Sequence, residues 1–237
     1  MDIKIRKAQN EILDVFSEKA KDFALAGGTA LELYYLHHRF SADLDFFSPT
    51  YDLSEIESLV SAFGRYFGKT LKLEAEFLVT GKAKVRFYTV SVKGSDRPLK
   101  IDFVEDVFFS KPAIKKFKGV RVYSVDNIYM QKIATVSGIP SGVDEVGRDL
   151  RIGRREEARD AFDIYMLSKK IQPLHIFLKK TPRYLQRGMV HWYRTFSRQE
   201  TKLSLLDLDI YDKQFDSKRM IIYLENEIKK FTEDAIE

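Results

Sequence analysis

The chain has 237 residues, of which 44% are hydrophobic and 32% charged, a composition typical of a folded protein with a sizeable core and not of a disordered one. It contains no cysteine, which excludes disulfides, thiolate metal sites and cysteine nucleophiles, and its four histidines leave little room for a histidine-built zinc site. The net charge of +5 is compatible with a polyanionic partner but does not identify one.

No apolar run in the sequence approaches the roughly 18 to 20 residues that are needed to cross a bilayer. Residues 1–6 lack the apolar stretch and the small-residue cleavage site of a signal peptide. We therefore expect a cytoplasmic protein with no membrane partner.

The first half of the chain is predicted to alternate helices with strands. Helices are expected over residues 8–21, 29–39 and 54–67, and strands over residues 23–26, 43–47, 71–79, 84–92, 99–104 and 120–124. Pro49 closes the second strand because proline cannot donate to the ladder, and Gly68 is expected to end the third helix.

After residue 125 the pattern becomes helical. Helices are predicted over residues 126–136, 154–169, 173–194 and 213–231, and the glycine-rich stretch 137–155 is expected to be a loop. The patterns predict an α+β fold, with one domain over residues 1–125 and a helical C-terminal domain over residues 126–237.

Two acidic residues on one predicted strand are the first candidates for chemistry. Asp43 and Asp45 are two residues apart, so both carboxylates project from one face of the strand while Leu44 and Phe46 point into the core. Neighbouring carboxylates repel each other unless a cation lies between them. Oxygen ligands of this kind suit Mg²⁺, which often takes its remaining ligands from water and substrate phosphates.

A glycine pair ahead of this Asp-x-Asp distinguishes it from a second copy, Asp207 to Asp209, which we interpret as surface structure. Gly27 and Gly28 lie between a predicted strand and helix, where backbone N–H groups can face an anion and the missing Cβ lets a phosphate come close. Thr29 is expected either to cap the helix or to bond a phosphate oxygen. Without the aspartates, such a segment is most often a plain turn and cap.

A third carboxylate is expected from another strand. Ile101 and Phe103 take the core face of the predicted strand 99–104, so Asp102 points to the side of the acidic pair if the two strands are neighbours. Three such carboxylates match a two-metal phosphoryl-transfer site, in which one of them orients or deprotonates the attacking hydroxyl. Considered alone, Asp102 would be interpreted as a solvated strand residue. If the register of the strand differs, Glu105 or Asp106 could take its place as the third carboxylate.

Several short motifs resemble a known family. They are Gly-Gly-Thr-Ala-Leu at residues 27–31, Arg-x-Ser-x-Asp-Leu-Asp-Phe at residues 39–46, Ile-Asp-Phe at residues 101–103, a lysine-bearing helix at residues 129–134 and Arg-Asp-x-x-Asp at residues 159–165. Their order is similar to that of the abortive-infection toxin nucleotidyltransferases of the AbiEii/AbiGii type, in the DNA polymerase β-like nucleotidyltransferase superfamily. The resemblance implies a nucleotidyltransferase-like mixed β-sheet flanked by helices and followed by a C-terminal helical region.

The resemblance also implies a role for each motif residue. Asp43, Asp45 and Asp102 would be the catalytic residues and would bind Mg²⁺, with two ions expected. The residues implied to hold the nucleotide or its phosphates are Gly27, Gly28, Thr29, Ser41, Lys132 and Asp163. A triphosphate beside three carboxylates needs metals and a lysine to offset the charge, so the set is chemically coherent.

The last two residues of that set have structural alternatives. Lys132 also fits a surface lysine that covers apolar neighbours with its stem, and Asp163 fits an i, i+4 partner of Arg159. His37 and His38 end a predicted helix, and we interpret them as favourable charges at the negative end of its dipole.

Residues 179–194 interleave cations with aromatic side chains. Such a segment can contact a nucleic-acid backbone and stack on a base. It is more often an amphipathic helix with Trp192 buried and the arginines solvated.

The first functional hypothesis is a metal-dependent nucleotidyltransferase that moves a nucleoside monophosphate from an NTP to an acceptor hydroxyl. The resemblance implies a toxin of a bacterial toxin–antitoxin or phage-defence system, with a tRNA end or a protein hydroxyl as acceptor and a cognate antitoxin encoded nearby. The alternative is a non-catalytic nucleotide- or RNA-binding module of the same fold. A phosphoesterase or nuclease also uses paired aspartates, but it does not explain the glycine turn.

Overall fold

The computed structural model describes residues 2–78, 83–143, 149–152 and 158–234. Contacts divide the chain into two compact units. The first unit comprises Met1–Tyr35 and Phe40–Ile128, and the second comprises Leu36–Arg39 and Tyr129–Glu237. The sequence carries no local signal that residues 36–39 would group with the second unit.

A single sheet of seven strands organises the first unit, in the order β3-β4-β5-β2-β1-β7-β6. The strands are Ala24–Ala26 (β1), Leu44–Ser48 (β2), Lys72–Phe77 (β3), Val85–Val90 (β4), Leu99–Glu105 (β5), Ile114–Phe117 (β6) and Val120–Tyr123 (β7). The pairs β2–β5 and β1–β7 are parallel and the other pairs are antiparallel. This confirms the α+β class with a mixed sheet.

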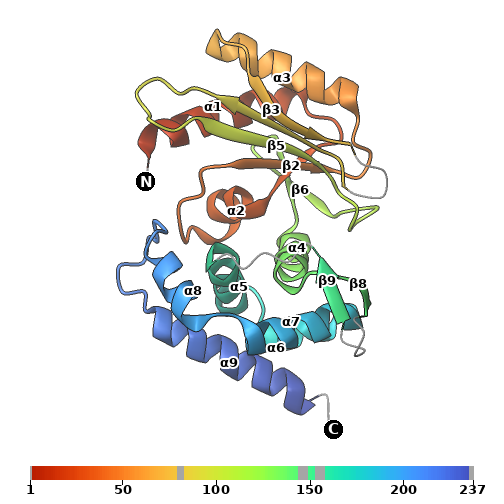
Figure 1. The fold of residues 1–237 in the computed structure, drawn as a ribbon. Coiled ribbons are helices and arrows are strands. Elements are labelled where there is room, and N and C mark those ends of the chain that lie inside the picture. Colours follow the sequence, from red (N-terminus) through yellow and green to blue (C-terminus); the bar gives the residue numbers. More distant parts are fainter. Residues whose placement is uncertain (1, 79–82, 144–148, 153–157, 235–237) are drawn as a thin grey trace. The chain divides into compact units, whose positions relative to one another are not determined.

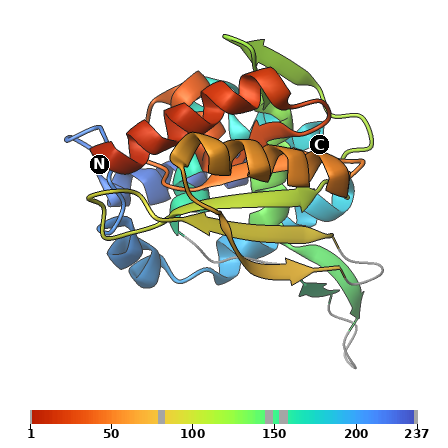
Figure 2. The ribbon, with the colours of Figure 1, turned by 90° about the horizontal axis from the view of Figure 1, so that it is seen from above.

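Two helices of this unit, α1 (Ile3–Lys19) and α3 (Leu53–Phe67), lie side by side on the same face of the sheet (Figures 1 and 2). The apolar side of α1 is buried, and Phe16 stacks on Phe46 of β2 with ring centroids 4.2 Å apart. Gly68 ends α3 in the left-handed conformation, at φ 60°, as the sequence predicts.

The helix predicted over residues 29–39 has different bounds. It begins as α2 (Gly27–Ala30) and continues as a π-helical turn, Leu31–Leu36. His37 has a φ of 47°, outside the helical range, so the helix ends before the two histidines. The prediction was wrong at both ends, because the glycine pair forms the first turn itself and the backbone leaves the helical conformation at His37.

The second unit is mostly helical. Its helices are α4 (Val125–Ser137, which begins in the first unit), α5 (Ala158–Lys170), α6 (Leu174–Lys179), α7 (Arg183–Thr195), α8 (Arg198–Leu205) and α9 (Ser217–Asp234). The long helix α9 packs against α5, α6, α7 and α8 (Figure 1).

Two further expectations for elements were wrong, and one strand was not predicted. The stretch 137–155 is not a plain loop, because β8 (Ile139–Val143) pairs with β9 (Asp149–Ile152); residues 144–148 and 153–155 lie outside the described residues. The helix predicted over residues 173–194 is divided into α6 and α7, and Pro182 caps the second piece. The edge strand β6 was missed because its two exposed lysines hide the apolar alternation.

No helix in the described ranges combines the length and the apolar character that a membrane span requires.

Candidate active site

Asp45 and Asp102 lie next to each other on neighbouring strands. β2 and β5 pair in parallel, and the register sets Asp45 directly opposite Asp102. The alternating residues of both strands are fully buried: Leu44, Phe46, Ile101 and Phe103. Because neighbours in register point to the same side of a sheet, both half-buried carboxylates share the face opposite this core. The condition on which the sequence argument for Asp102 depended is met.

The glycine bend lies against Asp45. β1 runs antiparallel to β2 with Ala26 opposite Asp45, and Gly27 follows with a φ of 67°. A Cβ placed on Gly27 would lie 2.2 Å from Oδ2 of Asp45. Glycine is therefore required here twice, for its left-handed backbone and for the space that the carboxylate occupies. Gly28 follows it in the first turn of α2, where it is buried.

Thr29 connects the glycine turn to the approach of β2. Its hydroxyl donates a hydrogen bond to the backbone carbonyl of Asp43 and lies 3.3 Å from the carbonyl of Ser41. The helix has Ala26 as its N-cap without a side-chain bond, so the capping role expected of Thr29 was wrong. Because the helix starts at Gly27, Thr29 lies inside its first turn and its fully buried hydroxyl reaches the residues ahead of β2.

The backbone of Ser41 is fixed on both sides. Its N–H donates to Oε2 of Glu32 at 2.8 Å, and its carbonyl accepts from Nε2 of Gln9 at 3.0 Å. Asp43 comes directly before β2, with a half-buried side chain. The segment that leads into the acidic strand is thus held by α1, α2 and the π-helical turn.

In the described part of the chain, no group of three or more histidine or acidic side chains is arranged to hold one metal ion. Mg²⁺, however, is usually bound by one or two carboxylates and completes its octahedron with water and substrate phosphates. The oxygen donors of Asp45 and Asp102, with Asp43 two residues earlier, fit that chemistry, and the bend at Gly27 leaves the Asp45 carboxylate room.

The acidic alternatives to Asp102 have structural partners. The buried carboxylate of Asp106 accepts from the hydroxyl of Tyr123 at 2.8 Å and from two backbone N–H groups, and Glu105 pairs with Lys84 at 3.2 Å. Burial and the neighbouring Asp106 carboxylate raise the pKa of Tyr123, so its hydroxyl remains a donor.

Lys132 is a buried residue of the second unit. Its Nζ lies 2.5 Å from Oδ1 of Asp160 and 2.8 Å from Oδ2 of Asp163. Burial disfavours the charged form, but the carboxylates of Asp163 and Asp160 outweigh it and raise the pKa of Lys132. The alternative of a surface lysine was therefore wrong.

Asp163 is fully buried and contacts Arg39 and His38 in addition to Lys132. Nε and Nη2 of Arg39 each donate to its carboxylate at 2.7 Å, and Nε2 of His38 lies 2.8 Å away. Although burial opposes ionisation, Arg39, Lys132 and these hydrogen bonds hold the pKa of Asp163 well below its usual range. The alternative interpretation of Asp163, as an i, i+4 partner of Arg159 at the surface, was wrong because the side chain is fully buried.

Sequence reasoning missed three members of this buried network: His38, Arg39 and Asp160. The helix-dipole role given to His38 is replaced by the contact with Asp163, since the helix ends at Leu36. The sequence shows an arginine next to the acidic motif and two aspartates within an otherwise apolar turn of α5, but it does not show which residues these side chains pair with.

The candidate residues thus belong to two different units. Gly27, Gly28, Thr29, Ser41, Asp43, Asp45 and Asp102 all belong to the first unit. Lys132 and Asp163 belong to the second, where they contact each other.

Residues 179–194 form the end of α6 and most of α7. Trp192 is buried and stacks on Phe196 with centroids 4.6 Å apart, so it is not available to stack on a base. Arg183, Arg187 and Arg194 are exposed. The interpretation as an amphipathic helix with solvated arginines is confirmed.

The sequence matches the protein family described as nucleotidyl transferase AbiEii toxin, Type IV TA system, over residues 11–231. Two crystal structures from Helicobacter pylori share the fold: JHP933, with 16% identity, a TM-score of 0.59 and coverage of 98% of this chain and 94% of that one; and a candidate nucleotidyltransferase, with 17% identity, a TM-score of 0.59 and coverage of 98% and 96%. None of the curated proteins matches this chain.

Proposed function

Because the chain belongs to the AbiEii family of nucleotidyl transferase toxins, we propose that it transfers a nucleoside monophosphate from an NTP to an acceptor hydroxyl in the cytoplasm. The observation that supports this most strongly is the pairing of Asp45 with Asp102 on neighbouring strands, beside the bend at Gly27. Adjacent carboxylates repel each other in the absence of a cation, so the arrangement favours a bound one.

Each motif residue has a proposed role. Asp43, Asp45 and Asp102 would hold Mg²⁺, and the bound ion would offset the charge of the triphosphate and of the attacking and leaving oxygens. Gly27 and Gly28 offer backbone N–H groups to the phosphates in the first turn of α2. Thr29 and Ser41 keep the approach of β2 against that turn through their hydrogen bonds.

The proposed transfer balances as a single displacement. The acceptor hydroxyl oxygen forms a bond to the α-phosphorus, and the bond from that phosphorus to the bridging oxygen breaks, so that pyrophosphate leaves. The hydroxyl proton passes to a carboxylate, for which Asp102 is the candidate because it lies on β5, apart from the Asp-x-Asp segment of Asp43 and Asp45.

Lys132 is proposed to contact a phosphate, and Asp163 to position it. Asp160 and Asp163 hold the Lys132 ammonium in one place, at 2.5 and 2.8 Å, so its direction is fixed before any nucleotide binds. A preorganised charge of this kind stabilises a phosphoryl group without being rearranged during the reaction.

The proposed acceptor is the end of an RNA such as tRNA. The exposed arginines of α7 support it, because regularly spaced cations on one helix face can follow a phosphate backbone. The family description as the toxin of a Type IV system supports a cognate antitoxin that limits the activity.

The test is label transfer from α-labelled NTPs, with Mg²⁺ and a total extract of RNA and protein. We expect labelled RNA with the native chain, almost none with Asp45→Asn, and native yield with Asp207→Asn, an exposed aspartate of the second Asp-x-Asp. If only protein became labelled, the proposal that RNA is the acceptor would be contradicted. Nucleotide binding without pyrophosphate release would contradict the transferase and support the binding module.

A further inference from the structure

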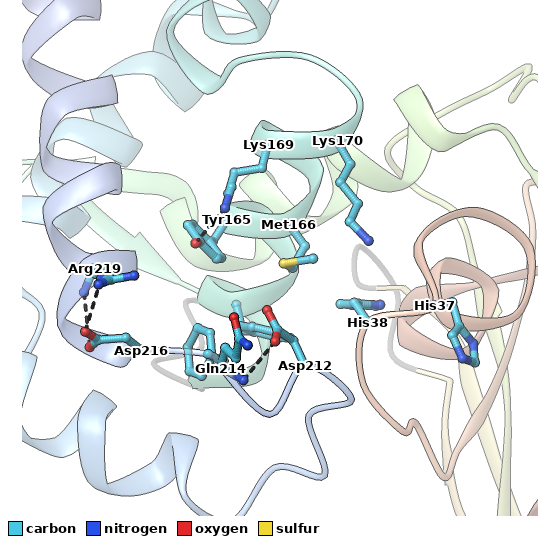
Figure 3. A pocket seen from close by; sticks show the side chains of 12 residues that line it. His37, His38, Tyr165, Met166, Lys169, Lys170, Asp212, Gln214, Asp216 and Arg219 are labelled. Atoms are coloured by element: carbon cyan, nitrogen blue, oxygen red, sulfur yellow. Dashed lines mark hydrogen bonds and ion pairs between the residues drawn. The ribbon is translucent and has the colours of Figure 1, made fainter.

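The second unit contains a pocket of about 360 Å³ (Figure 3). It is lined by α5, by the two histidines at residues 37–38 and by residues 212–219 around the start of α9. Every lining residue belongs to the second unit. A pocket of this size falls within the range that holds small organic ligands.

One wall of the pocket is aromatic. The ring of Phe215 meets that of Phe162 edge-on, at 5.0 Å and 81°, and lies 6.3 Å from that of Tyr165. Phe162 in turn stacks on the ring of His38 at 5.6 Å. Phe162 and Tyr165 are buried, so the half-buried Phe215 is the ring of this wall with surface left for a ligand, and a flat ring is the ligand shape that it suits.

Two lysines stand over this wall. Nζ of Lys169 donates to the hydroxyl of Tyr165, and Nζ of Lys170 donates to the carbonyl of Leu36, each at 3.2 Å. Across the described ranges, neither ammonium lies within ion-pair distance of a carboxylate, whereas Arg219 on the opposite side lies 3.6 Å from Asp216 (Figure 3). The two lysines therefore supply positive charge that is available to an anionic group.

His38 adds a polar atom to the pocket lining. Its Nε2 lies 2.8 Å from Oδ1 of Asp163, which leaves Nδ1 as the ring nitrogen that can take a further partner. Its Nδ1 is buried and has no hydrogen-bond partner among the described residues. A buried polar atom of this kind costs free energy unless a ligand or water forms a hydrogen bond with it.

We propose that this pocket binds a phosphorylated flat ring, that is, a nucleoside monophosphate, either free or as one unit of a single strand. The ring lies against the half-buried Phe215, the phosphate accepts from Lys169 and Lys170, and a polar group of the nucleoside forms a hydrogen bond with Nδ1 of His38. The aromatic ring, the two lysines and the buried nitrogen each match one part of that ligand. The site does not depend on the transfer reaction proposed for the first unit.

The experiment measures binding to the full chain by calorimetry, in EDTA and without NTP. The probes are AMP, GMP, CMP and UMP in one arm and a short single-stranded RNA in the other. We expect Lys170→Met to raise the dissociation constant about tenfold, as is typical for the loss of one charge-assisted contact. Lys202→Met, an exposed lysine of α8, and Asp45→Asn should leave it unchanged.

The two arms identify the source of the ligand. Binding of a mononucleotide with no gain for the strand indicates a free nucleotide, and tighter binding of the strand indicates a nucleotide within RNA. The proposal is overturned if no probe binds at millimolar concentration, or if Lys202→Met weakens binding as much as Lys170→Met. It is also overturned if Asp45→Asn abolishes binding, because the heat then comes from the first unit. Label transfer is not used as a readout, so the two proposals can fail separately.

Discussion

In the first unit Asp45 and Asp102 stand beside each other on paired strands, whereas in the second unit Asp160 and Asp163 are enclosed with the cations Lys132 and Arg39. Carboxylates that are placed side by side oppose folding and favour a ligand cation. A buried carboxylate that is matched by cations supports the fold only while the whole set is intact. Substitutions at the two places should therefore act on different quantities, activity in the first and stability in the second.

The largest effect is expected from Asp163→Asn. Removing this charge leaves Arg39 and Lys132 buried with too little compensation, and breaking a buried pair costs about 3–5 kcal/mol. Chemical denaturation should show that loss in the free energy of unfolding, while the exposed control Asp207→Asn should stay within about 0.5 kcal/mol of the native value. Equal stability of both variants would show that the network does not support the fold.

Gly27→Ala is expected to have the next largest effect. A Cβ in the left-handed conformation costs about 1–2 kcal/mol, and at this position it would also collide with the Asp45 carboxylate. Gly68→Ala is the matched control, with a φ of +60° and no atom within 4 Å of the added Cβ. We expect similar backbone strain in both variants but loss of label transfer only in Gly27→Ala. If Gly27→Ala transferred label at the native rate, the bend at Gly27 would not be needed for the reaction.

The acid dependence of stability should also distinguish the two places. The pKa of Asp163 lies well below its usual value of 3.8, so its contribution is fully present above that pH and is lost as the pH falls toward the lower folded value. One such group adds a slope of at most about 1.4 kcal/mol per pH unit. Denaturation between pH 5 and 3 should give a shallower slope for Asp163→Asn than for the native chain. If the free energy of unfolding of Asp163→Asn and of the native chain depended on pH with the same slope, other residues would cause the acid sensitivity.

The smallest effect is expected on the exposed face of α7. Arg187→Ala should weaken RNA binding a few-fold and reduce the dependence of log affinity on log salt by about one unit, because one phosphate contact is lost. Filter binding over a range of salt concentrations measures both. An unchanged salt slope, or the same change in Lys202→Ala on α8, would exclude this face as the RNA contact.

Local pattern was enough to predict the acidic strands. The alternation of Leu44 and Phe46 with aspartate, and of Ile101 and Phe103 with Asp102, correctly indicated two strands and their buried faces. Their adjacency depends on the pairing of segments far apart in the chain, so the sequence could only state it as a condition.

The contacts of the second unit could not be predicted in this way. Arg39 and Asp163 are 124 residues apart, and no periodicity links such a pair. The role of Thr29 was missed for a local reason. The helix begins at Gly27, two residues earlier than predicted, so Thr29 lies inside the first turn and not at the capping position. The hairpin of β8 and β9 was missed because glycine and proline in a strand look like a loop.

The most direct test of the account replaces Asp102 with asparagine and measures label transfer and unfolding in the same preparation. We expect transfer to fall at least roughly 100-fold while the free energy of unfolding does not fall, because the side chain acts on substrate and metal and its charge repels that of Asp45. Transfer by Asp102→Asn at the native rate would contradict it, and the pairing of Asp45 with Asp102 would then have no part in the chemistry.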